Sequence, residues 1–315
     1  MGRILCCSGA ASWFRYRVGM TYVCMRIHCG LGNQLFMAAL GLRLAQERKV
    51  RLIFDASAYL PREADRTYQL TNFSIAATTL SAPEKKGFAR SPLRFLNPQY
   101  RLAKRLASMR RHNFVRQRIW EFDHDVVKVV APVYLEGYWQ TERYFSNVEG
   151  LIRQQFQLRQ PITERRREWV KSIARAGASA VSLHVRRGDY VTQAQSGGAL
   201  WLCPAEWYAS AMTAIAEQIE APQFFVFSDD PGWARANLPD TWPRNFIEPD
   251  ADGRDFEDLY VMSTCRHHVI PNSTFSWWGA WLNPRRDKTV IAPLKWFTTQ
   301  SIDTSDMTPA NWRRI

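Results

Sequence analysis

The stretch 184–190, which reads HVRRGDY, carries the residues in this chain best suited to chemistry on a charged ligand. Arg186 and Arg187 suit a dianionic group, because guanidinium forks match phosphate oxygens and keep their charge at any working pH. His184 and Asp189 add two side chains that can titrate, and Gly188 lets the backbone turn between them. An isolated Arg-Arg pair is more often a solvated surface turn, so the rest of the chain must decide between the two interpretations.

Polar side chains also follow two other apolar segments, at the point where each segment ends. Alternating apolar residues predict a buried strand at 180–185, directly before the arginines. Further strands are predicted at 223–227, followed by Ser228, Asp229 and Asp230, and at 267–270, followed by polar residues at 272–276. In an open parallel sheet the carboxyl ends of the strands meet at one edge, where ligands bind. We therefore expect the three strand ends to converge on one crevice.

The chemistry of these strand ends is complementary. The arginines offer charged forks, and three side chains offer hydroxyls together with the N–H groups of a helix N-terminus: Ser273, Thr274 and Ser276. This combination suits a diphosphate. Asp229 and Asp230 would repel phosphate and are expected further out, where a carboxylate can accept the parallel N–H bonds that guanine offers. A metal pair is the minority interpretation of Asp229 and Asp230, because no third ligand is in view.

The elements around this crevice alternate between strands and helices. Helices are predicted at 204–219, 255–262 and 272–281, and short strands at 245–247 and 289–292. A loop is expected over 191–203. This alternation predicts a parallel sheet in a doubly wound α/β domain.

The first half of the chain opens with a strand, a turn, a helix and a second strand, predicted at 25–29, 30–34, 35–49 and 50–55. The turn contains Gly32, Asn33 and Gln34 and would aim backbone N–H groups at a ligand above the helix N-terminus. The third glycine of a dinucleotide fingerprint is missing. Residues 126–134 are strand-like, and the aromatic segment 137–145 belongs either in a cleft or in a packed interdomain corner. The segment 56–118 has no readable element boundaries.

A helix over 159–177 is predicted to link two domains, with the boundary near 160. The predicted organisation is a leader over 1–24, an acceptor-side α/β domain over 25–160 and a ligand-binding α/β domain over 161–315. The leader is expected to be disordered, or to reflect a misassigned start with Met20 or Met25 as the true one. It has no continuous apolar region of a signal peptide, and no run of eighteen apolar residues predicts a transmembrane anchor.

The composition is that of a soluble globular protein with an excess of basic residues. Of the 315 residues 46% are hydrophobic and 23% charged, and the net charge is +13. The segment Lys85–Arg118 holds eleven Lys and Arg and no acid, which suits an anionic membrane surface, nucleic acid, a negatively charged substrate or simply solvent. A nucleic-acid partner is not predicted, since neither an RNA-binding signature nor zinc-ligand spacing is present. The six scattered cysteines indicate reduced thiols in the cytoplasm.

The motif at 184–190 resembles the HxRRGDY motif of the α-1,2-fucosyltransferases, glycosyltransferase family 11. Four other segments are similar to motifs of the same family, in the family's order: 30–36 (GLGNQLF), 137–145 (GYWQTERYF), 227–230 (FSDD) and 272–282 (NSTFSWWGAWL). The matches run from about 25 to 292 and so cover nearly the whole chain. Their co-occurrence is highly specific.

The resemblance implies a GT-B fold with two Rossmann-like domains, and the donor site in the C-terminal parallel sheet. It implies GDP-fucose as a substrate, a galactose-containing glycan acceptor that takes fucose at O2, inversion at the anomeric carbon, and neither metal nor cofactor. Position by position, Arg186 matches the arginine that neutralises the departing GDP, and Arg187 supports the loop or the same charge. His184 fits a hydrogen-bonding residue near the phosphates. The remaining donor-binding positions are Asp229 and Asp230 at guanine, Asn272, Ser273, Thr274 and Ser276 at the phosphate-facing helix, and Gly32, Asn33 and Gln34 on the opposite wall.

Asp189 is our hypothesis for the base that takes the acceptor proton, and an ion pair with Arg187 that only holds the turn is the equal alternative. Two other functions remain open: the same scaffold with another linkage or GDP-6-deoxyhexose, such as α-1,6-fucosyl transfer, and a non-catalytic protein that binds glycans or sugar nucleotides. A cytoplasmic enzyme of surface polysaccharide synthesis, in peripheral contact with the inner face of the membrane, would explain a basic protein without an anchor.

Overall fold

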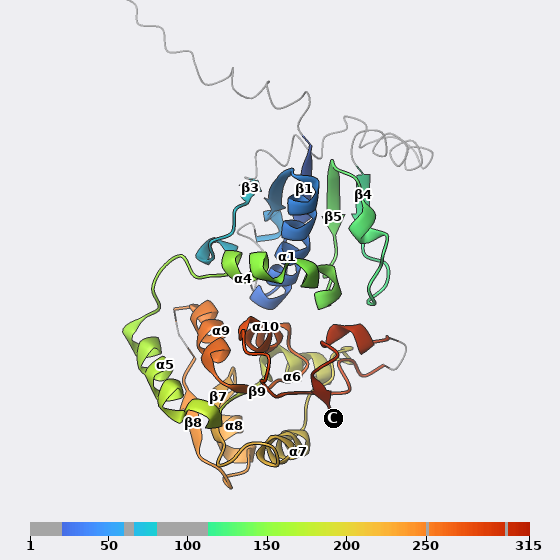
Figure 1. The fold of residues 1–315 in the computed structure, drawn as a ribbon. Coiled ribbons are helices and arrows are strands. Elements are labelled where there is room, and N and C mark those ends of the chain that lie inside the picture. The colour runs from blue at the N-terminus through green and yellow to red at the C-terminus, as the bar shows by residue number, and fades with distance from the viewer. Residues whose placement is uncertain (1–20, 60–65, 81–112, 250–251, 300–301) are drawn as a thin grey trace, which may run out of the picture.

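The computed structural model describes residues 21–59, 66–80, 113–249, 252–299 and 302–315, and within them the chain forms two parallel β-sheets with helices around each (Figure 1). The N-terminal sheet lies in the upper half of Figure 1 and the C-terminal sheet in the lower half. This is the two-domain α/β architecture that the sequence predicts.

The N-terminal sheet has the strand order β3-β2-β1-β5-β4, and each neighbouring pair is parallel. Its strands are β1 (Tyr22–Arg26), β2 (Arg51–Asp55), β3 (Thr78–Leu80), β4 (Asn113–Arg116) and β5 (Val133–Glu136). The long helix α1 (Leu31–Arg48) connects β1 to β2, and most of its residues are buried. The predicted order of strand, turn, helix and strand is confirmed, but the turn expected over 30–34 is wrong, because α1 begins at Leu31 and its first turn contains Gly32, Asn33 and Gln34.

Two further predictions in this half are wrong in their bounds. β1 begins at Tyr22, so residues 22–24, assigned to the leader, belong to the sheet; Val23 and Cys24 are fully buried there. The strand expected over 126–134 starts only at Val133, and Val126–Lys128 forms a short 3-10 turn instead. Pro132 has no N–H for a strand ladder, which explains why the strand begins after it.

The C-terminal sheet has the order β11-β10-β9-β6-β7-β8 and is also parallel throughout. Its strands are β6 (Ala180–Val185), β7 (Gln223–Ser228), β8 (Arg244–Ile247), β9 (His267–Val269), β10 (Val290–Ala292) and β11 (Arg313–Arg314). β6 is buried along its whole length between β9 and β7. The bounds of β6 were predicted correctly from the alternation of Val181, Leu183 and Val185; Ser182 and His184 between them are buried as well, because the strand is covered on both faces.

The helices of this half are α5 (Glu164–Ala176), α6 (Gly188–Gln195), α7 (Ala205–Ala216), α8 (Pro231–Asn237), α9 (Asp255–Thr264) and α10 (Thr274–Leu282). The loop predicted over 191–203 is wrong in its first part, because α6 continues to Gln195. Asp189 lies in the first turn of α6, where a carboxylate favours helix formation. We interpreted the same residue as catalytic and so missed this signal.

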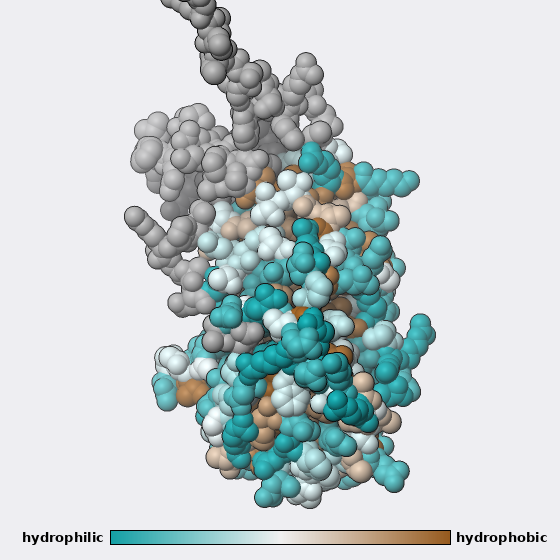
Figure 2. Space-filling model, turned by 90° about the vertical axis from the view of Figure 1, so that its left-hand side faces the viewer, coloured by the Kyte–Doolittle hydropathy of each residue, from teal (hydrophilic) through white to brown (hydrophobic). Residues whose placement is uncertain are grey.

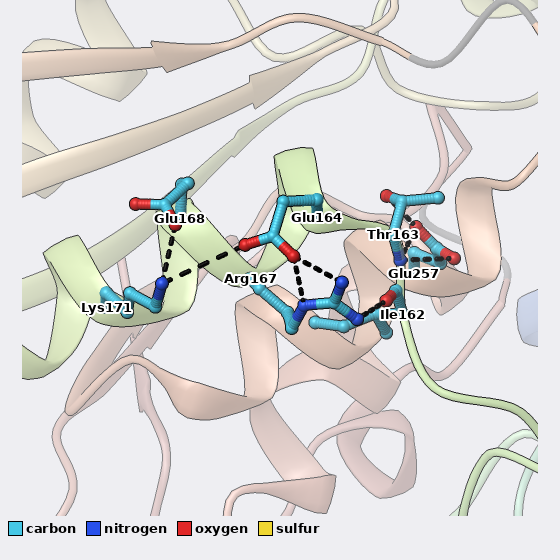
Figure 3. Close-up of polar contacts among 7 residues, drawn as sticks. All are labelled: Ile162, Thr163, Glu164, Arg167, Glu168, Lys171 and Glu257. Carbon is cyan, nitrogen blue, oxygen red and sulfur yellow. Dashed lines mark hydrogen bonds and ion pairs between the residues drawn. The ribbon is translucent and has the colours of Figure 1, made fainter.

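The predicted domain boundary near 160 falls in the segment that joins α4 (Glu149–Gln155) to α5. This segment is anchored to α9 through the fully buried Glu257 (Figure 3). The carboxylate of Glu257 accepts hydrogen bonds from the Thr163 hydroxyl (2.7 Å) and the Thr163 backbone N–H (3.2 Å), and it pairs with Arg254. The start of α5 is thereby fixed against the helix whose first turn reaches the cleft described below.

The two halves share an aromatic core where α1 and α10 lie side by side (Figure 1). Phe36 of α1 packs against Trp277 and Trp278 of α10, at ring-centre distances of 4.5 and 5.0 Å. Trp139, Tyr144 and Phe145 are fully buried in the same core. The aromatic segment 137–145 therefore forms the packed corner that was one of its two interpretations, although two of its residues also reach a cleft.

The side of the molecule that carries α5 presents mainly hydrophilic side chains, with small scattered apolar patches (Figure 2). Across the described residues, no helix is long and apolar enough to cross a membrane. Of the basic segment 85–118, only 113–118 lies in the described part of the chain.

Candidate active site

A cleft of about 620 Å³ lies between the two halves, at the carboxyl ends of β6 and β7 and at the N-termini of α1 and α10. The three strand ends predicted to converge do meet here. From the candidate residues, the lining includes His184, Arg186, Asp189, Asp229, Asn272, Ser273, Thr274, Gly32 and Asn33. The other candidates, Arg187, Asp230, Ser276 and Gln34, are not among the lining residues.

Arg186 lies at the centre of this edge, with its guanidinium between two carboxylates. Its Nη1 is 2.8 Å from Asp229 Oδ2, and its Nη2 pairs with Asp189 Oδ1. The guanidinium carbon is 5.5 Å from the ring centre of Tyr190, and the Tyr190 hydroxyl donates to the Asn272 carbonyl (2.9 Å). These contacts fix the position of a permanent positive charge in the cleft.

Asp189 pairs with Arg186 and, through Oδ2, with Arg66 at 2.7 Å. The alternative that paired Asp189 with Arg187 is therefore wrong in its partner, although Asp189 does make ion pairs. Arg66 comes from the other half of the molecule, so this carboxylate bridges the cleft. Both of its oxygens are engaged by guanidinium groups, and accepting a proton would require one of these contacts to break.

Arg187 points away from the cleft. Its guanidinium stacks on Trp233 (4.0 Å to the ring centre), and its Nε lies 3.3 Å from Asp230 Oδ2. Asp230 also caps α8 by accepting the Trp233 backbone N–H at 3.0 Å, and Asp229 Oδ1 accepts the Arg187 backbone N–H at 2.8 Å. Of the two roles expected for Arg187, these contacts favour support of the loop. The carboxylate of Asp230 is therefore occupied by contacts within the protein and does not line the cleft, where it was expected to bind guanine.

His184 is 5% exposed and faces the cleft with a neutral ring. Burial, and then the charge of Arg186, lower the pKa of His184 to about 3. Its Nδ1 is buried and has no hydrogen-bond partner among the described residues. An unsatisfied buried nitrogen costs free energy, so a ligand that supplies a partner gains from this site. His184 therefore suits a hydrogen bond to a ligand in the cleft and not proton transfer at neutral pH.

The N-termini of α1 and α10 meet at the floor of the cleft. A Cβ on Gly32 would lie only 2.5 Å from the backbone nitrogen of Phe275, and the Trp278 indole N–H donates to the Gly32 carbonyl at 3.0 Å. Ser273, at the N-cap of α10, makes no side-chain capping bond, so N–H groups of the first turn remain for another acceptor. Two converging helix N-termini favour an anion in this place.

Two of the candidate residues, Asn272 and Ser276, form hydrogen bonds to backbone carbonyls of the protein. Asn272 donates to the carbonyls of Trp201 (2.7 Å) and Trp296 (2.8 Å), and the buried Ser276 hydroxyl donates to the Ser273 carbonyl (3.4 Å). Their contacts hold the loops that follow the strands.

On the opposite wall, Gln34 is fully buried, donates to the carbonyls of Cys29 and Thr67, and accepts from the Gln69 backbone N–H. It fastens the segment that carries Arg66. Asn33 does line the cleft and accepts a hydrogen bond from Gln140 at 2.7 Å.

Several residues that line the cleft were not among the predicted site residues, namely Arg66, Gln69, Trp120, Tyr138, Tyr190 and Asp255, although Tyr138 and Tyr190 belong to segments that the sequence singled out. Arg66 and Trp120 belong to irregular segments, where periodicity carries no signal. Asp255 was assigned only to the start of the helix predicted over 255–262; burial raises its pKa, and its Oδ1 is buried without a partner among the described residues.

The minority interpretation of Asp229 and Asp230 as a metal pair finds no third ligand. Within the described residues, no group of three or more His, Cys, Asp and Glu side chains is arranged to hold a metal ion. Each of the two aspartates is instead paired with an arginine.

Two α/β units with parallel sheets, facing each other across a cleft at the carboxyl ends of their strands, define the GT-B fold of glycosyltransferases. The model of glycosyl transferase family 11 matches residues 22–315, and the chain belongs to this family. It is thus a glycosyltransferase, as the resemblance of its motifs predicted.

Two relatives from Escherichia coli match over nearly the whole chain. The alpha-1,2-colitosyltransferase is 31% identical over 298 residues, covering 94% of this chain and 99% of the relative. The O-antigen biosynthesis glycosyltransferase WbnK is 30% identical over 298 residues, covering 90% and 97%. The galactoside 2-alpha-L-fucosyltransferase SEC1 of Bos taurus is 27% identical over 154 residues, which are 48% of this chain and 42% of that protein.

Solved structures match most of this chain at low sequence identity. A point mutant of Arabidopsis thaliana FUT1 in complex with GDP has a TM-score of 0.50 at 13% identity, covering 86% of this chain and 70% of that one. The fucosyltransferase NodZ from Bradyrhizobium has a TM-score of 0.48 at 16% identity, covering 85% and 95%.

Proposed function

We propose that this chain transfers L-fucose from GDP-fucose to O2 of a galactose residue in a glycan, with inversion and without a metal ion. The observation that carries the proposal is the position of Arg186, fixed in the cleft opposite two helix N-termini. A permanent cation and two positive helix ends suit a diphosphate that leaves with its charge increased. Names among the family relatives support a 1,2-linkage, since both the colitosyl and the fucosyl enzymes carry it.

In the proposed reaction the bond between the anomeric carbon and the β-phosphate oxygen breaks, and its electron pair leaves with GDP. The acceptor oxygen attacks the anomeric carbon from the opposite face and loses its proton. Arg186 gives up its contact with Asp189 Oδ1 and binds the β-phosphate, where it neutralises the negative charge that develops as the bond breaks. His184 supplies a hydrogen bond near the phosphates through its neutral ring.

Asp189 is the proposed proton acceptor. It lines the cleft, and the contact that Arg186 gives up to the phosphate leaves Asp189 Oδ1 for the acceptor hydroxyl. The ion pair with Arg66 would hold the carboxylate in place through this exchange. We propose that guanine binds where Asp229 and Asp255 line the cleft; Asp230 enters this role only if it releases Arg187.

The second candidate donor is a GDP-linked colitosyl group, because a relative with that activity in its name matches 94% of this chain. A relative named for O-antigen biosynthesis supports a surface polysaccharide as the acceptor. The two donors differ in the sugar alone, so both use the same contacts to GDP.

A mass-spectrometric screen tests the proposal. The purified protein is incubated with GDP-fucose or GDP-colitose and a panel of β-galactosides, and the linkage of each product is determined by NMR. We expect a 1,2-linked fucosyl galactoside. Product formed only with GDP-colitose would show that colitose and not fucose is transferred, and a 1,6-linked product would contradict the proposed 1,2-linkage. GDP binding without turnover of either donor would favour a non-catalytic binding protein.

A further inference from the structure

A second hollow, of about 330 Å³, opens at the carboxyl end of the N-terminal sheet. Its lining comes from the segments that directly follow three strands: His28 after β1, residues 116–120 at the end of β4, and residues 136–138 at the end of β5. Trp120 and Tyr138 line both this hollow and the large cleft, so the two are adjacent. The carboxyl edge of a parallel sheet is where such folds bind ligands, and nothing in the proposed donor site uses this one.

The border between the two cavities is an aromatic platform. The rings of Trp120 and Tyr138 stack with their centres 5.8 Å apart and their planes 10° from parallel. Tyr138 meets the edge of His28 at 4.9 Å, and Trp120 contacts Phe297 of the C-terminal half at 5.2 Å. Flat aromatic faces that are partly exposed offer the apolar side of a pyranose ring a large contact area at little entropic cost.

The wall beside the platform holds a carboxylate in a fixed position. Glu136, the last residue of β5, pairs with Arg26 through one oxygen and with Arg116 through the other, the latter at 3.0 Å. Each oxygen keeps a lone pair for a hydroxyl donor, while the guanidinium groups supply N–H donors beside them. A fixed carboxylate flanked by donors suits a neutral polyhydroxyl ligand.

The loops that carry this wall are tied together before any ligand binds. Gln117 Oε1 accepts the backbone N–H groups of Tyr138 (2.6 Å) and Trp139 (3.2 Å), and Gln117 Nε2 donates to the Ile119 carbonyl (2.9 Å). Gly137 is required at this point, because a Cβ there would lie 2.5 Å from the Gln117 Cβ. Burial, and then the charge of Arg26, lower the pKa of His28, so the ring beside Tyr138 is neutral at neutral pH.

We propose that this hollow is the acceptor subsite, in which a neutral hexose stacks on Trp120 and binds Glu136 and Arg116 through its hydroxyls. The inference rests on the proposed function, since it takes the donor to occupy the Arg186 side of the cleft. Within the half already predicted to bind the acceptor, it names the residues that hold the sugar, with Trp120 and Tyr138 at the border to the donor.

The test compares Trp120→Leu with Trp120→Phe, because leucine keeps apolar bulk but lacks a ring face, whereas phenylalanine keeps one. With GDP-fucose and lactose, we expect Trp120→Leu to raise the KM for lactose at least about tenfold while the KM for GDP-fucose changes less than about twofold. Trp120→Phe should recover most of the lactose affinity. Trp242→Leu is the matched control, since Trp242 packs on Phe224 at the amino end of β7 and lines neither cavity.

Saturation-transfer NMR of lactose and N-acetyllactosamine with the GDP-loaded protein separates this inference from the proposed function. Saturation of a galactoside that is lost in Trp120→Leu and kept in Trp120→Phe and Trp242→Leu supports the subsite even if no transfer is observed. Equal saturation in the wild type and in Trp120→Leu, or none in the wild type while GDP still binds, overturns it. If the galactoside binds through Trp120 but GDP does not bind, the proposed GDP site at Arg186 is contradicted while the acceptor subsite stands.

Discussion

Arg186 and Arg187 are neighbours in one motif, yet their side chains have separate tasks. Arg186 lies in the cleft between Asp189 and Asp229, whereas Arg187 stacks on Trp233 and holds the loop to α8. A pair of charges that looks uniform along the chain therefore divides into one residue for the ligand and one for the framework. The same division separates Asp229, which lines the cleft, from Asp230, which caps a helix.

Replacement of Arg186 by Ala tests the role of the cleft arginine. We expect kcat to fall about 10²–10³-fold, because a fixed charge aimed at the leaving group is lost at the moment the bond breaks. Steady-state kinetics with GDP-fucose measure the change. Arg235→Ala is the control, since Arg235 pairs with Glu248 on the exposed side of α8. A kcat within about threefold of the wild type for Arg186→Ala would remove the assignment.

The same residues lead to a prediction about metal ions. If Arg186 and the helix N-termini stabilise the leaving diphosphate, transfer should proceed at full rate in an excess of EDTA. Initial rates with and without chelator measure this. A loss of activity that Mg²⁺ or Mn²⁺ restores would show that a cation shares the charge stabilisation, and it would revive Asp229 as a ligand.

At the scale of elements, the site depends on how closely α1 approaches α10. Their N-termini meet at Gly32, and the aromatic residues of α10 pack on Phe36 one turn further along α1. One contact between two helices therefore sets both the floor of the cleft and the junction of the two halves.

Gly32→Ala should lower the free energy of unfolding by about 1–3 kcal/mol, because the added methyl group overlaps the backbone of Thr274 and Phe275. Urea unfolding monitored by tryptophan fluorescence measures it. Gly150→Ala is a closely matched control: Gly150 is likewise the second residue of its helix, and nothing lies within 4 Å of its added Cβ. There we expect equal or higher stability, since alanine favours a helix over glycine by up to about 1 kcal/mol. Equal losses in both variants would argue against the close helix contact.

At the scale of the whole molecule, two buried histidines of the C-terminal sheet make stability depend on pH. His184 has a pKa near 3, and burial lowers the pKa of His268 well below its usual value. Asn283 Nδ2 lies 2.9 Å from His268 Nε2 and Ser182 Oγ lies 3.1 Å from His268 Nδ1, contacts that a neutral ring can satisfy at both nitrogens. The unfolded chain protonates these histidines as the pH falls through about 6.5, and the folded protein does not.

The free energy of unfolding should therefore decrease as the pH falls from about 6.5 toward 4, by up to about 1.4 kcal/mol per pH unit for each neutral buried histidine. Denaturant midpoints between pH 7.5 and 4.5 measure this slope. His184→Asn removes one titrating group and should make the slope shallower. A midpoint that stays constant or rises toward acid would contradict the neutral, buried state of these rings.

The net charge of +13 leads to a prediction for the molecule as a whole. If it places the enzyme at an anionic membrane surface, the protein should sediment with vesicles that contain anionic lipid at low salt and remain in solution at high salt. Vesicles of neutral lipid are the control. Sedimentation that does not depend on salt, or no sedimentation with either kind of vesicle, would contradict electrostatic membrane binding. The basic residues would then form only a solvated surface.

Local sequence patterns were sufficient to predict many of the strands and helices of this protein and its family. Apolar and alternating segments predicted β6, β7 and β9 and the helices α7, α9 and α10, because periodicity and caps act within a few residues. The order of parallel strands then implied that their polar ends share one edge, and five motifs in sequence order indicated the family that the whole-chain match confirms.

Only the tertiary structure decided which side chains face the cleft. Asp230, Gln34 and Ser276 have the right chemistry in the right segments, but each is used by a neighbour that is distant in sequence or by its own helix. Arg66 and Trp120 come from irregular segments, and long-range packing brings them to the cleft. The physical reason is that backbone preference is local, whereas the partner of a polar side chain depends on contacts across the whole chain.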